Sequence, residues 1–384
     1  MSARANVRGR IRVCPDETKQ KEFLWLNRKS RLVVTVEQAE NNVVSGQAQS
    51  SAPLRMVTCP CCGARLFLRG DLPPLSTTPC SRCQHPVMIP LRLRQFELRV
   101  PIASGGMGTV YRAWDTVLER DVAIKLIKPE VAEDVGARET LLREARVLAK
   151  LNHTNIIHIY TFDEHEGHHY LVMELADQGT LDDRIAQGPL DELFVLDIGI
   201  KLASALDAAL KHGFLHRDIK PANILFNADD EPKLIDFGLA SRADEKEEEG
   251  GDAVWGTPFY IAPEKVARQG ETFLSDMYSL AATLYHALTG RVPFDAPTVE
   301  EVVMAHLNTP VTPPNMVNPN VSQPTSDAIV RAMAKNPEER FQSYDEFIMA
   351  LTAARSQLLV NRYIRPASGG EKKGGLIGWF RKSG

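Results

Sequence analysis

Residues 216–223 read HRDIKPAN, a polar stretch that carries an acid, a cation and an amide close together. A carboxylate such as that of Asp218 can accept the proton of a hydroxyl group. The amide of Asn223 and the carboxylate of Asp236, which follows in LIDFGLA, can together hold a divalent cation such as Mg²⁺ or Mn²⁺. This combination indicates chemistry at a hydroxyl group beside a bound metal ion.

Groups suited to phosphates precede this stretch. Lys125 lies on a predicted strand in DVAIK, and Glu144 lies on a predicted helix in LLREARVL, from which it can pair with that lysine. ASGGMGTVY (residues 103–111) separates two predicted strands, and its glycines let backbone N–H groups approach phosphates without a Cβ clash. A Gly-rich turn alone indicates only a hairpin. Followed in order by these lysine, acid and amide groups, it indicates phosphoryl transfer.

Residues 96–355 resemble a eukaryotic-like (Hanks-type) serine/threonine protein kinase of the bacterial kind. The resemblance is carried by SGGMGTVYRAWD, DVAIK, LNHTNIIHIY, HRDIKPAN, LIDFGLA and IAPE. It implies an α+β, two-lobed protein-kinase fold with a β-rich N-lobe and an α-helical C-lobe. It also implies transfer of the γ-phosphate of Mg-ATP to proteins in intracellular signalling. Lys220 and the GTPFY segment match the pattern for Ser/Thr acceptors.

The resemblance implies a catalytic role for four residues. Asp218 would be the base, Lys220 would steady the γ-phosphate, and Lys125 would contact the α- and β-phosphates while Glu144 fixes it. The implied ATP-binding residues are Ala103, Gly105, Gly106, Gly108, Val110, Ala123, Lys125, Glu174, Ala176 and Leu225, with Met173 as gatekeeper.

Further polar residues complete the implied site. Asn223 and Asp236 would bind Mg²⁺, Asp276 would brace the catalytic loop, and Arg340 would pair with Glu264 of IAPE. All catalytic groups of the pattern are present, which favours an active enzyme over an inactive ATP-sensing scaffold.

The phosphate loop departs from the family pattern at its first glycine. Ala103 stands there, and its extra methyl would weaken ATP binding, although Gly105 and Gly108 remain.

An acidic run, DEKEEEGGD (residues 244–252), lies in what resembles the activation loop. In the family, the arginine at Arg217 needs an anion to order this loop, often a phosphothreonine. Three interpretations stay open: Glu247–Glu249 supply a fixed anion, the run is solvated without such a pair, or it contacts the basic N-terminal segment and inhibits. Ser241 and Thr257 are the neighbouring hydroxyls.

The cysteines cluster between residues 59 and 83. The pairs Cys59-x-x-Cys62 and Cys80-x-x-Cys83 have the spacing of a four-thiolate zinc site, and residues 56–90 resemble a zinc ribbon that a structural Zn²⁺ would stabilise. Cys61 is a surplus thiol. Unligated or redox-active thiols, and His85 as a substitute ligand, are the alternatives.

Two functions of the ribbon are considered, nucleic-acid binding and a regulatory or protein-docking role. Residues 55–100 hold seven Arg against two acids, which permits nucleic-acid contact, but the segment lacks an aromatic stacking platform. A regulatory or protein-docking role is favoured over nucleic-acid binding.

Composition sets the remaining limits. The 384 residues are 43% hydrophobic and 24% charged, with a net charge of −4, so the whole chain gives no reason to expect binding to nucleic acid or a membrane. No secretory signal or spanning segment is visible, and we expect a cytoplasmic protein.

The expected divisions are a poorly ordered basic segment over 1–54 with a hairpin over 23–36, a zinc ribbon over 56–90, a kinase domain over 96–355 and a flexible basic tail over 356–384. As an alternative to a flexible end, the tail would make a weak peripheral contact with a membrane.

Hydrophobic periodicity predicts strands first and helices later in the chain. The expected strands run to about residue 128 and over 156–162 and 169–175, with a change of register at Gln95–Phe96. The expected helices cover 137–151, 191–213, 274–290, 300–307, 326–335 and 344–357.

Overall fold

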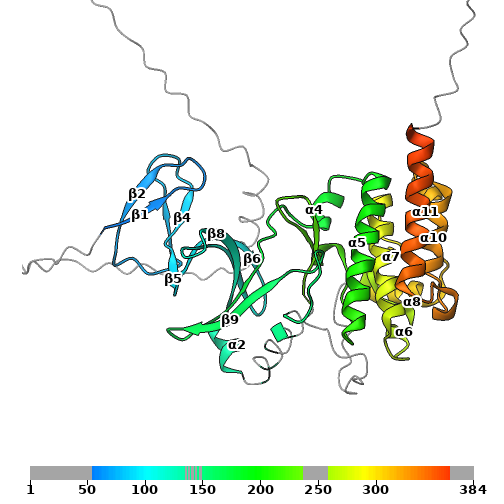
Figure 1. The fold of residues 1–384 in the computed structure, drawn as a ribbon, viewed down its shortest axis with the longest axis horizontal. Coiled ribbons are helices and arrows are strands. Elements are labelled where there is room, and N and C mark those ends of the chain that lie inside the picture. Colours follow the sequence, from blue (N-terminus) through cyan, green and yellow to red (C-terminus); the bar gives the residue numbers. More distant parts are fainter. Residues whose placement is uncertain are drawn as a thin grey trace, which may run out of the picture. The chain divides into compact units, whose positions relative to one another are not determined.

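The computed structural model describes residues 54–134, 149–236 and 258–363, together with residues 136, 139, 142, 145 and 146 (Figure 1). The chain divides into two units, one formed by Met1–Pro101 with Tyr111–Asp121 and the other by Ile102–Val110 with Val122–Gly384. The expected hairpin over 23–36, the acidic run and the tail from residue 364 onward lie outside the described residues.

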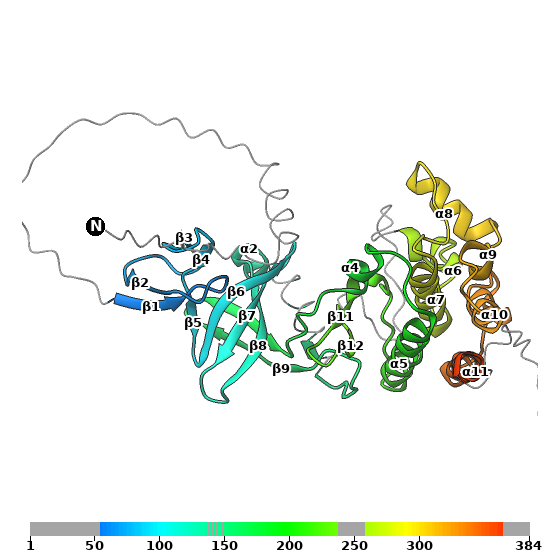
Figure 2. The same ribbon diagram turned by 90° about the horizontal axis from the view of Figure 1, so that it is seen from above.

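Two short hairpins form the cysteine-rich part of the first unit (Figure 2). Strand β1 (Leu54–Thr58) pairs antiparallel with β2 (Arg65–Arg69), and β3 (Thr77–Pro79) pairs antiparallel with β4 (Pro86–Met88). The small core of this part consists of Cys59, Leu66, Cys80 and Val87. With a core cluster this small, apolar burial alone is a weak source of stability for such a module.

A tight turn follows the cysteine-rich part. Strand β5 (Leu91–Leu93) pairs antiparallel with β6 (Phe96–Ser104), and Arg94 between them has a positive φ of 51°. The change of register predicted at Gln95–Phe96 is therefore confirmed as a turn from one strand into another.

The strands of the second unit include a buried antiparallel group. Strand β8 (Arg120–Ile127) pairs with β10 (His168–Met173), which pairs in turn with β9 (Ile159–His165). Strand β7 (Gly108–Asp115) precedes them, and β11 (Ile224–Phe226) and β12 (Pro232–Leu234) form a separate hairpin. Consecutive residues of β8 and β10 are buried, as expected for strands covered on both faces.

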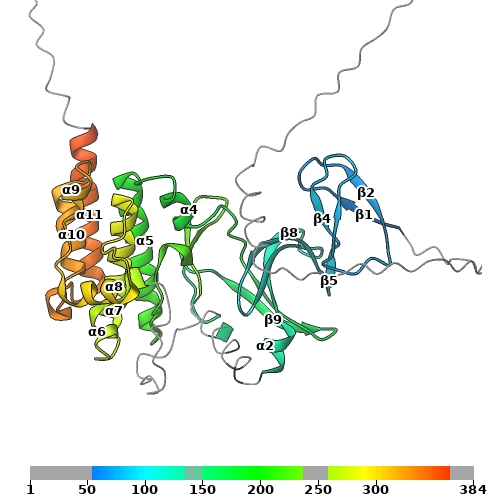
Figure 3. The ribbon, with the colours of Figure 1, turned by 180° about the vertical axis from the view of Figure 1, so that it is seen from behind.

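Helices make up most of the described residues after residue 180 (Figure 3). They are α4 (Leu181–Ile185), α5 (Glu192–Lys211), α6 (Pro263–Val266), α7 (Phe273–Thr289), α8 (Val299–Asn308), α9 (Pro314–Val317), α10 (Gln323–Ala332) and α11 (Tyr344–Tyr363), with α2 (Pro129–Glu133) earlier. Single 3₁₀ turns occur at Pro221–Asn223, Pro258–Tyr260 and Pro337–Glu339.

The two central helices begin and end at recognisable residues. Asp191 caps α5 by accepting the backbone N–H groups of Leu193 and Phe194. Thr272 and Ser275 form a reciprocal capping box at the start of α7, and Gly290 ends this helix in the left-handed region at φ 68°. These signals lie within two residues of the predicted helix limits.

Helices α5, α7 and α11 pack side by side around the main core (Figure 1). At Gly199 of α5, an added Cβ would lie 2.8 Å from a methyl of Leu284 on α7 and 3.1 Å from a methyl of Leu351 on α11. Glycine therefore permits the close approach of all three helices. Helix α11 also continues to Tyr363, several residues beyond the helix end predicted at 357.

Candidate active site

The loop before β11 gathers three of the predicted site residues. Asp218 Oδ2 accepts a hydrogen bond from Lys220 Nζ at 2.7 Å and another from Asn223 Nδ2 at 3.0 Å. Asn223 Nδ2 also donates to the backbone oxygen of Asp218 at 2.8 Å. The chain folds this way because Pro221 starts a 3₁₀ turn that brings Asn223 back toward Asp218.

Asp276 on helix α7 holds the backbone of this loop. Its Oδ2 accepts the N–H of His216 at 2.7 Å, and its Oδ1 accepts the N–H of Arg217 at 2.8 Å. Burial raises the pKa of Asp276, while the hydrogen bonds from the two amides oppose that shift. The brace that the family resemblance implied for Asp276 is present.

His216 joins the loop to the segment that ends at Asp236. The buried imidazole Nε2 lies 2.9 Å from the carbonyl oxygen of Ile235, and burial lowers the pKa of this histidine. A neutral ring that donates to Ile235 satisfies that geometry. The backbone N–H of Ile235 also donates to the carbonyl oxygen of Asn223 at 3.0 Å, so the two segments are tied at two points.

Asp236 itself is exposed and has a positive φ of 58°. Aspartate tolerates the left-handed region better than most residues do. In the part of the chain that the structure describes, neither Asp236 nor Lys125 makes a hydrogen bond to Asp218, Lys220 or Asn223. The loop group is thus assembled by its own hydrogen bonds, whereas Lys125 lies on β8 and Asp236 lies just after β12.

The Gly-rich segment shows one position where only glycine fits. A Cβ on Gly108 would lie 2.2 Å from the backbone oxygen of Leu126. The loop is closed by a hydrogen bond from the Gly105 N–H to the Gly108 oxygen at 2.9 Å, and the Lys128 N–H donates to the Met107 oxygen at 3.1 Å. Added Cβ atoms on Gly105 and Gly106 would meet open space.

The strands behind this loop carry the predicted lysine and gatekeeper. Lys125 on β8 lies opposite Leu171, and Ala123 lies opposite Met173 on β10. Lys125 is partly buried, and so are Val110 and Leu225, whereas Ala123 and Ala176 are buried.

Glu174, one of the implied ATP-binding residues, is held through both its backbone and its side chain. Its N–H donates to the carbonyl oxygen of His158 at 2.8 Å, and its carboxylate pairs with Lys233 at 2.5 Å. The pair with Lys233 was not evident from the sequence, because the two residues are far apart along the chain.

A second buried ion pair fixes the start of α6. Arg340 donates to both oxygens of Glu264, at 2.7 Å and 2.8 Å, and Ser275 Oγ donates to Glu264 Oε1 at 2.7 Å. Burial raises the pKa of Glu264, but these hydrogen bonds and the positive charge of Arg340 outweigh it, so the net shift is downward. The pair implied between Arg340 and Glu264 is present.

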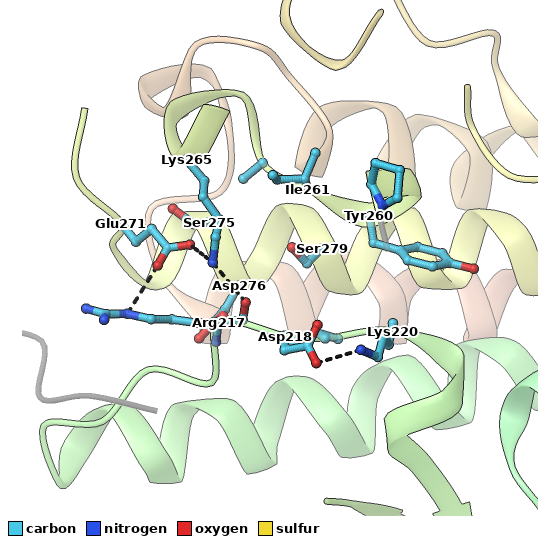
Figure 4. A pocket seen from close by; sticks show the side chains of 13 residues that line it. Arg217, Asp218, Lys220, Tyr260, Ile261, Lys265, Glu271, Ser275, Asp276 and Ser279 are labelled. Atoms are coloured by element: carbon cyan, nitrogen blue, oxygen red, sulfur yellow. Dashed lines mark hydrogen bonds and ion pairs between the residues drawn. The ribbon is translucent and has the colours of Figure 1, made fainter. Parts of the chain in front are cut away.

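Sequence reasoning missed one acid beside the catalytic loop. Figure 4 shows the Glu271 carboxylate between Arg217 and Lys265. Its Oε2 lies 3.2 Å from Arg217 Nε and its Oε1 lies 2.7 Å from Lys265 Nζ. Glu271 precedes the helix cap Thr272 in a polar stretch, and no periodicity marks it as buried. Only the tertiary contact reveals it.

Several predicted residues lie outside the described part of the chain. They are Glu144, the proposed partner of Lys125, and the activation-loop positions Gly238, Ser241, Glu247–Glu249 and Thr257. Most of the predicted helix over 137–151 is also outside it.

The cysteine cluster has a compact geometry. The Sγ atoms of Cys59, Cys62, Cys80 and Cys83 all lie within 4.8 Å of one another. Cys59 and Cys83 are 3.6 Å apart and Cys62 and Cys80 are 3.7 Å apart. A tetrahedral zinc ion with Zn–S bonds of about 2.3 Å requires sulfur separations of about 3.8 Å. The cluster thus fits zinc, with Cys61 and His85 outside it.

Two left-handed residues shape the knuckles of the cluster. Gly63 has φ 68° and Gln84 has φ 62°, and each turns the chain just after its cysteine pair. The Gly63 N–H returns to the Cys59 oxygen, and the Gln84 N–H returns to the Cys80 oxygen, both at 2.9 Å. The Arg82 N–H points at Cys80 Sγ at 3.4 Å.

The fold and this site place the chain in a known family. The model of the family described as protein kinase domain matches residues 96–351, well over half of the 384 residues. The chain therefore belongs to the protein kinase domain family, and the Hanks-type resemblance of its motifs is confirmed at this level.

Curated relatives are similar over the same part of the chain. Serine/threonine-protein kinase PknH of Mycobacterium bovis is 38% identical over 263 residues, which cover 68% of this chain and 44% of the relative. Serine/threonine-protein kinase PknE of the same organism is 39% identical over 261 residues, covering 67% and 46%. PknD of Mycobacterium tuberculosis is 38% identical over 258 residues, covering 66% and 39%. This chain thus matches less than half the length of these relatives.

Among the helices that the structure describes, none has both the length and the apolar character that crossing a bilayer requires.

Proposed function

We propose that this chain is a serine/threonine protein kinase that transfers the γ-phosphate of ATP to Ser and Thr hydroxyls of proteins in intracellular signalling. The observation that carries the proposal is the hydrogen-bonded group of Asp218, Lys220 and Asn223 on one braced loop. The names of the mycobacterial relatives, each a serine/threonine-protein kinase, support the same activity.

Asp218 is the proposed base for the acceptor hydroxyl. Its carboxylate can take the hydroxyl proton as the oxygen attacks the phosphoryl group. Lys220 Nζ, 2.7 Å from that carboxylate, supplies a positive charge beside the transferred group. Asp276 fixes the backbone on which Asp218 stands, so little reorganisation is needed for the reaction.

Asn223 and Asp236 are the proposed ligands of Mg²⁺. Asn223 uses its amide nitrogen to bind Asp218, which leaves the amide oxygen as the atom to bind a cation. Asp236 offers an exposed carboxylate, and both oxygens suit this metal. When bound, Mg²⁺ neutralises phosphate charge.

The proposed ATP site uses the Gly-rich loop and the strand behind it. Gly108 lets the loop approach the backbone of Leu126, and Lys125 on β8 would contact the phosphates. Glu144 would hold Lys125. Val110, Ala123 and Leu225 would contact adenine, with Glu174 to Ala176 as the hinge.

The test is transfer from labelled Mg-ATP to a generic acceptor protein. We expect Asp218→Asn to lower the rate by about 10²–10⁴-fold. Asp197→Asn, which changes an acid of a half-exposed ion pair on α5, is the matched control and should transfer normally. Wild-type protein that binds ATP without any transfer would instead support an ATP-sensing scaffold.

We also propose that Cys59, Cys62, Cys80 and Cys83 bind a structural Zn²⁺ ion in a ribbon over residues 56–90, followed by a kinase domain over 96–355. The sulfur separations of 3.6 and 3.7 Å and the small apolar core support this. Metal analysis of the whole chain should give about one zinc per chain, the number held by four thiolates. Cys62→Ser should lose it, whereas Cys61→Ser should keep it.

For the ribbon we propose a regulatory or docking task within a cytoplasmic protein, since thiolate zinc sites suit reducing compartments. The exposed apolar side chains Met56 and Phe67 on its two paired strands support protein docking. A salt-dependent mobility shift of the whole chain with nucleic acid would favour the nucleic-acid alternative instead.

A further inference from the structure

A buried charge cluster lies next to the proposed base and has no part in the reaction described above. Arg217, Lys265 and Glu271 form it, together with Asp276 of the loop brace (Figure 4). The side chains of Arg217 and Glu271 are only 9% and 4% exposed. Charges this deeply buried need partners, because an isolated ion would be strongly destabilising.

Glu271 is connected to Arg217 in two ways, directly at the side chain and through Lys265 at the backbone carbonyl. Its Oε2 pairs with the guanidinium Nε at 3.2 Å. Its Oε1 pairs with Lys265 Nζ, which itself donates to the carbonyl oxygen of Arg217 at 3.2 Å. Asp276 holds the backbone N–H of Arg217. The residue directly before Asp218 is therefore fixed at its amide, its carbonyl and its side chain.

This fixation matters because Arg217 has an unfavourable backbone. Its φ of 66° lies in the left-handed region, which is uncommon for a long side chain. Such a conformation persists only where the surroundings determine it. The carboxylate of Glu271 contacts Arg217 directly and also holds Lys265, which donates to the Arg217 carbonyl oxygen.

Glu271 also offsets the charge of its two cationic neighbours. Asp276 uses its two oxygens for the backbone N–H groups of His216 and Arg217. In the part of the chain that the structure describes, Glu271 pairs with both cationic side chains. Without it, the 9% exposed side chain of Arg217 and the 24% exposed side chain of Lys265 would both lose this negative partner.

We propose that Glu271 is a positioning residue of the kinase site, a built-in anion that holds Arg217 and thereby Asp218 in the arrangement for phosphoryl transfer. This inference rests on the proposed kinase activity. It assigns to a residue before α7 the part for which the sequence suggested Glu247–Glu249 or a phosphorylated hydroxyl. Transfer should then not depend on a phosphate elsewhere in the chain.

The titration of Glu271 agrees with this geometry. Burial raises its pKa to about 7, and the charges of Lys265 and Arg217 oppose that rise. The two cations therefore limit a rise that burial dominates, and the carboxylate is mostly charged only above about pH 7.

The experiment compares steady-state transfer by the full chain after treatment with a phosphatase that is then removed. We expect wild-type kcat to be unchanged by the treatment. Glu271→Gln should lower kcat by about 10- to 100-fold, the cost of a small misplacement of a catalytic group, with the KM for ATP changed much less. Glu271→Asp keeps the charge and should recover part of the loss. Asp197→Asn is the control.

A second background separates positioning from general damage. If Glu271 acts through Arg217, then Glu271→Gln should add little further loss of kcat to a chain that already carries Arg217→Met. Melting curves show that each variant is folded. If Glu271→Gln does not fold, Glu271→Asp alone tests the inference. Its kcat should then be several-fold below that of the wild type.

Three results would overturn the inference while leaving the kinase proposal intact. The first is a kcat of the Glu271 variants equal to that of wild type. The second is a Glu271→Gln loss of kcat that is as large in the Arg217→Met chain as in the wild type. The third is a wild-type protein that loses its activity after phosphatase treatment. Wild-type protein without any transfer would overturn the proposed function itself.

Discussion

Two buried carboxylates near the start of α7 face arginines in different ways. Glu264 receives two parallel hydrogen bonds from Arg340 and one from Ser275, and its pKa is lowered. Glu271 has one ion pair to Arg217 and one to Lys265, and its pKa is raised to about 7. Similar burial thus gives opposite shifts, since the number and geometry of hydrogen bonds decide whether the charged form is favoured.

The difference separates two tasks. The pair of Glu264 and Arg340 is saturated with hydrogen bonds, and Arg340 is completely buried, so it behaves as a permanent brace. The contact between Glu271 and Arg217 is longer and has a single nitrogen–oxygen approach. It can fix a loop beside the proposed base while remaining sensitive to its surroundings.

The largest effect should come from breaking the brace. Arg340→Met leaves the carboxylate of Glu264 buried without its partner, which should lower the free energy of unfolding by about 3–5 kcal/mol. Urea unfolding followed by circular dichroism measures this. A loss no greater than that of a surface substitution would show that the bidentate pair is not needed.

A smaller loss is expected at the second pair. Glu271→Gln removes a charge that burial disfavours and keeps a polar side chain, so we expect a loss of about 1–3 kcal/mol. The same urea experiment applies, and the comparison requires Glu271→Gln to destabilise less than Arg340→Met. The reverse order would contradict the distinction between brace and loop anchor.

The two acids should also give opposite pH dependence. The ordinary pKa of each is 4.5. The folded state raises that of Glu271 to about 7, so its contribution to stability is full below 4.5 and is lost as pH rises to about 7. Glu264, with a lowered pKa, contributes above 4.5 and loses that contribution as pH falls further.

The pH prediction is checked by urea unfolding at about pH 5 and about pH 8, either side of the raised value. Relative to wild type, Glu271→Gln should lose more stability at the lower pH than at the higher one. The charged groups that face Glu271 are Lys265, Arg217 and Asp276. Equal losses at both values would contradict the raised pKa.

The smallest effect should come from the half-exposed pairs of Asp197. This acid contacts Lys201 at 2.8 Å and Arg355 at 2.9 Å, and its side chain is 42% exposed. Water screens such pairs, so Asp197→Asn should change stability by about 0.5 kcal/mol or less. A loss of stability as large as that of Glu271→Gln would mean that burial does not determine how much these ion pairs contribute.

The sequence was sufficient for those parts of the site that are local in the chain. Asp218, Lys220 and Asn223 lie within one short motif, and their hydrogen bonds form across a single 3₁₀ turn. The cysteine spacing likewise predicted which four thiols converge, because each pair sits on its own tight turn. The five longer helices after residue 180, which are α5, α7, α8, α10 and α11, followed from hydrophobic periodicity, whereas the short helices α4, α6 and α9 were not predicted.

Contacts between distant residues could not be predicted in the same way. The burial of Glu271 depends on Arg217, which lies far upstream, and nothing in the local GETFL stretch distinguishes it from an exposed acid. The pair of Lys233 and Glu174 is equally non-local. The proposed anions Glu247–Glu249 lie outside the described residues and remain a prediction.

The length of α11 bears on where this domain can be trimmed. The family match ends at residue 351, but Ala354 beyond it is almost fully buried and Leu358 packs on the main core. Arg355 and Arg362 reach across to the acids Asp197 and Asp191 of α5 and its cap. A truncation at the family boundary would expose part of the α5 surface, so an intact catalytic fragment has to extend to about residue 363.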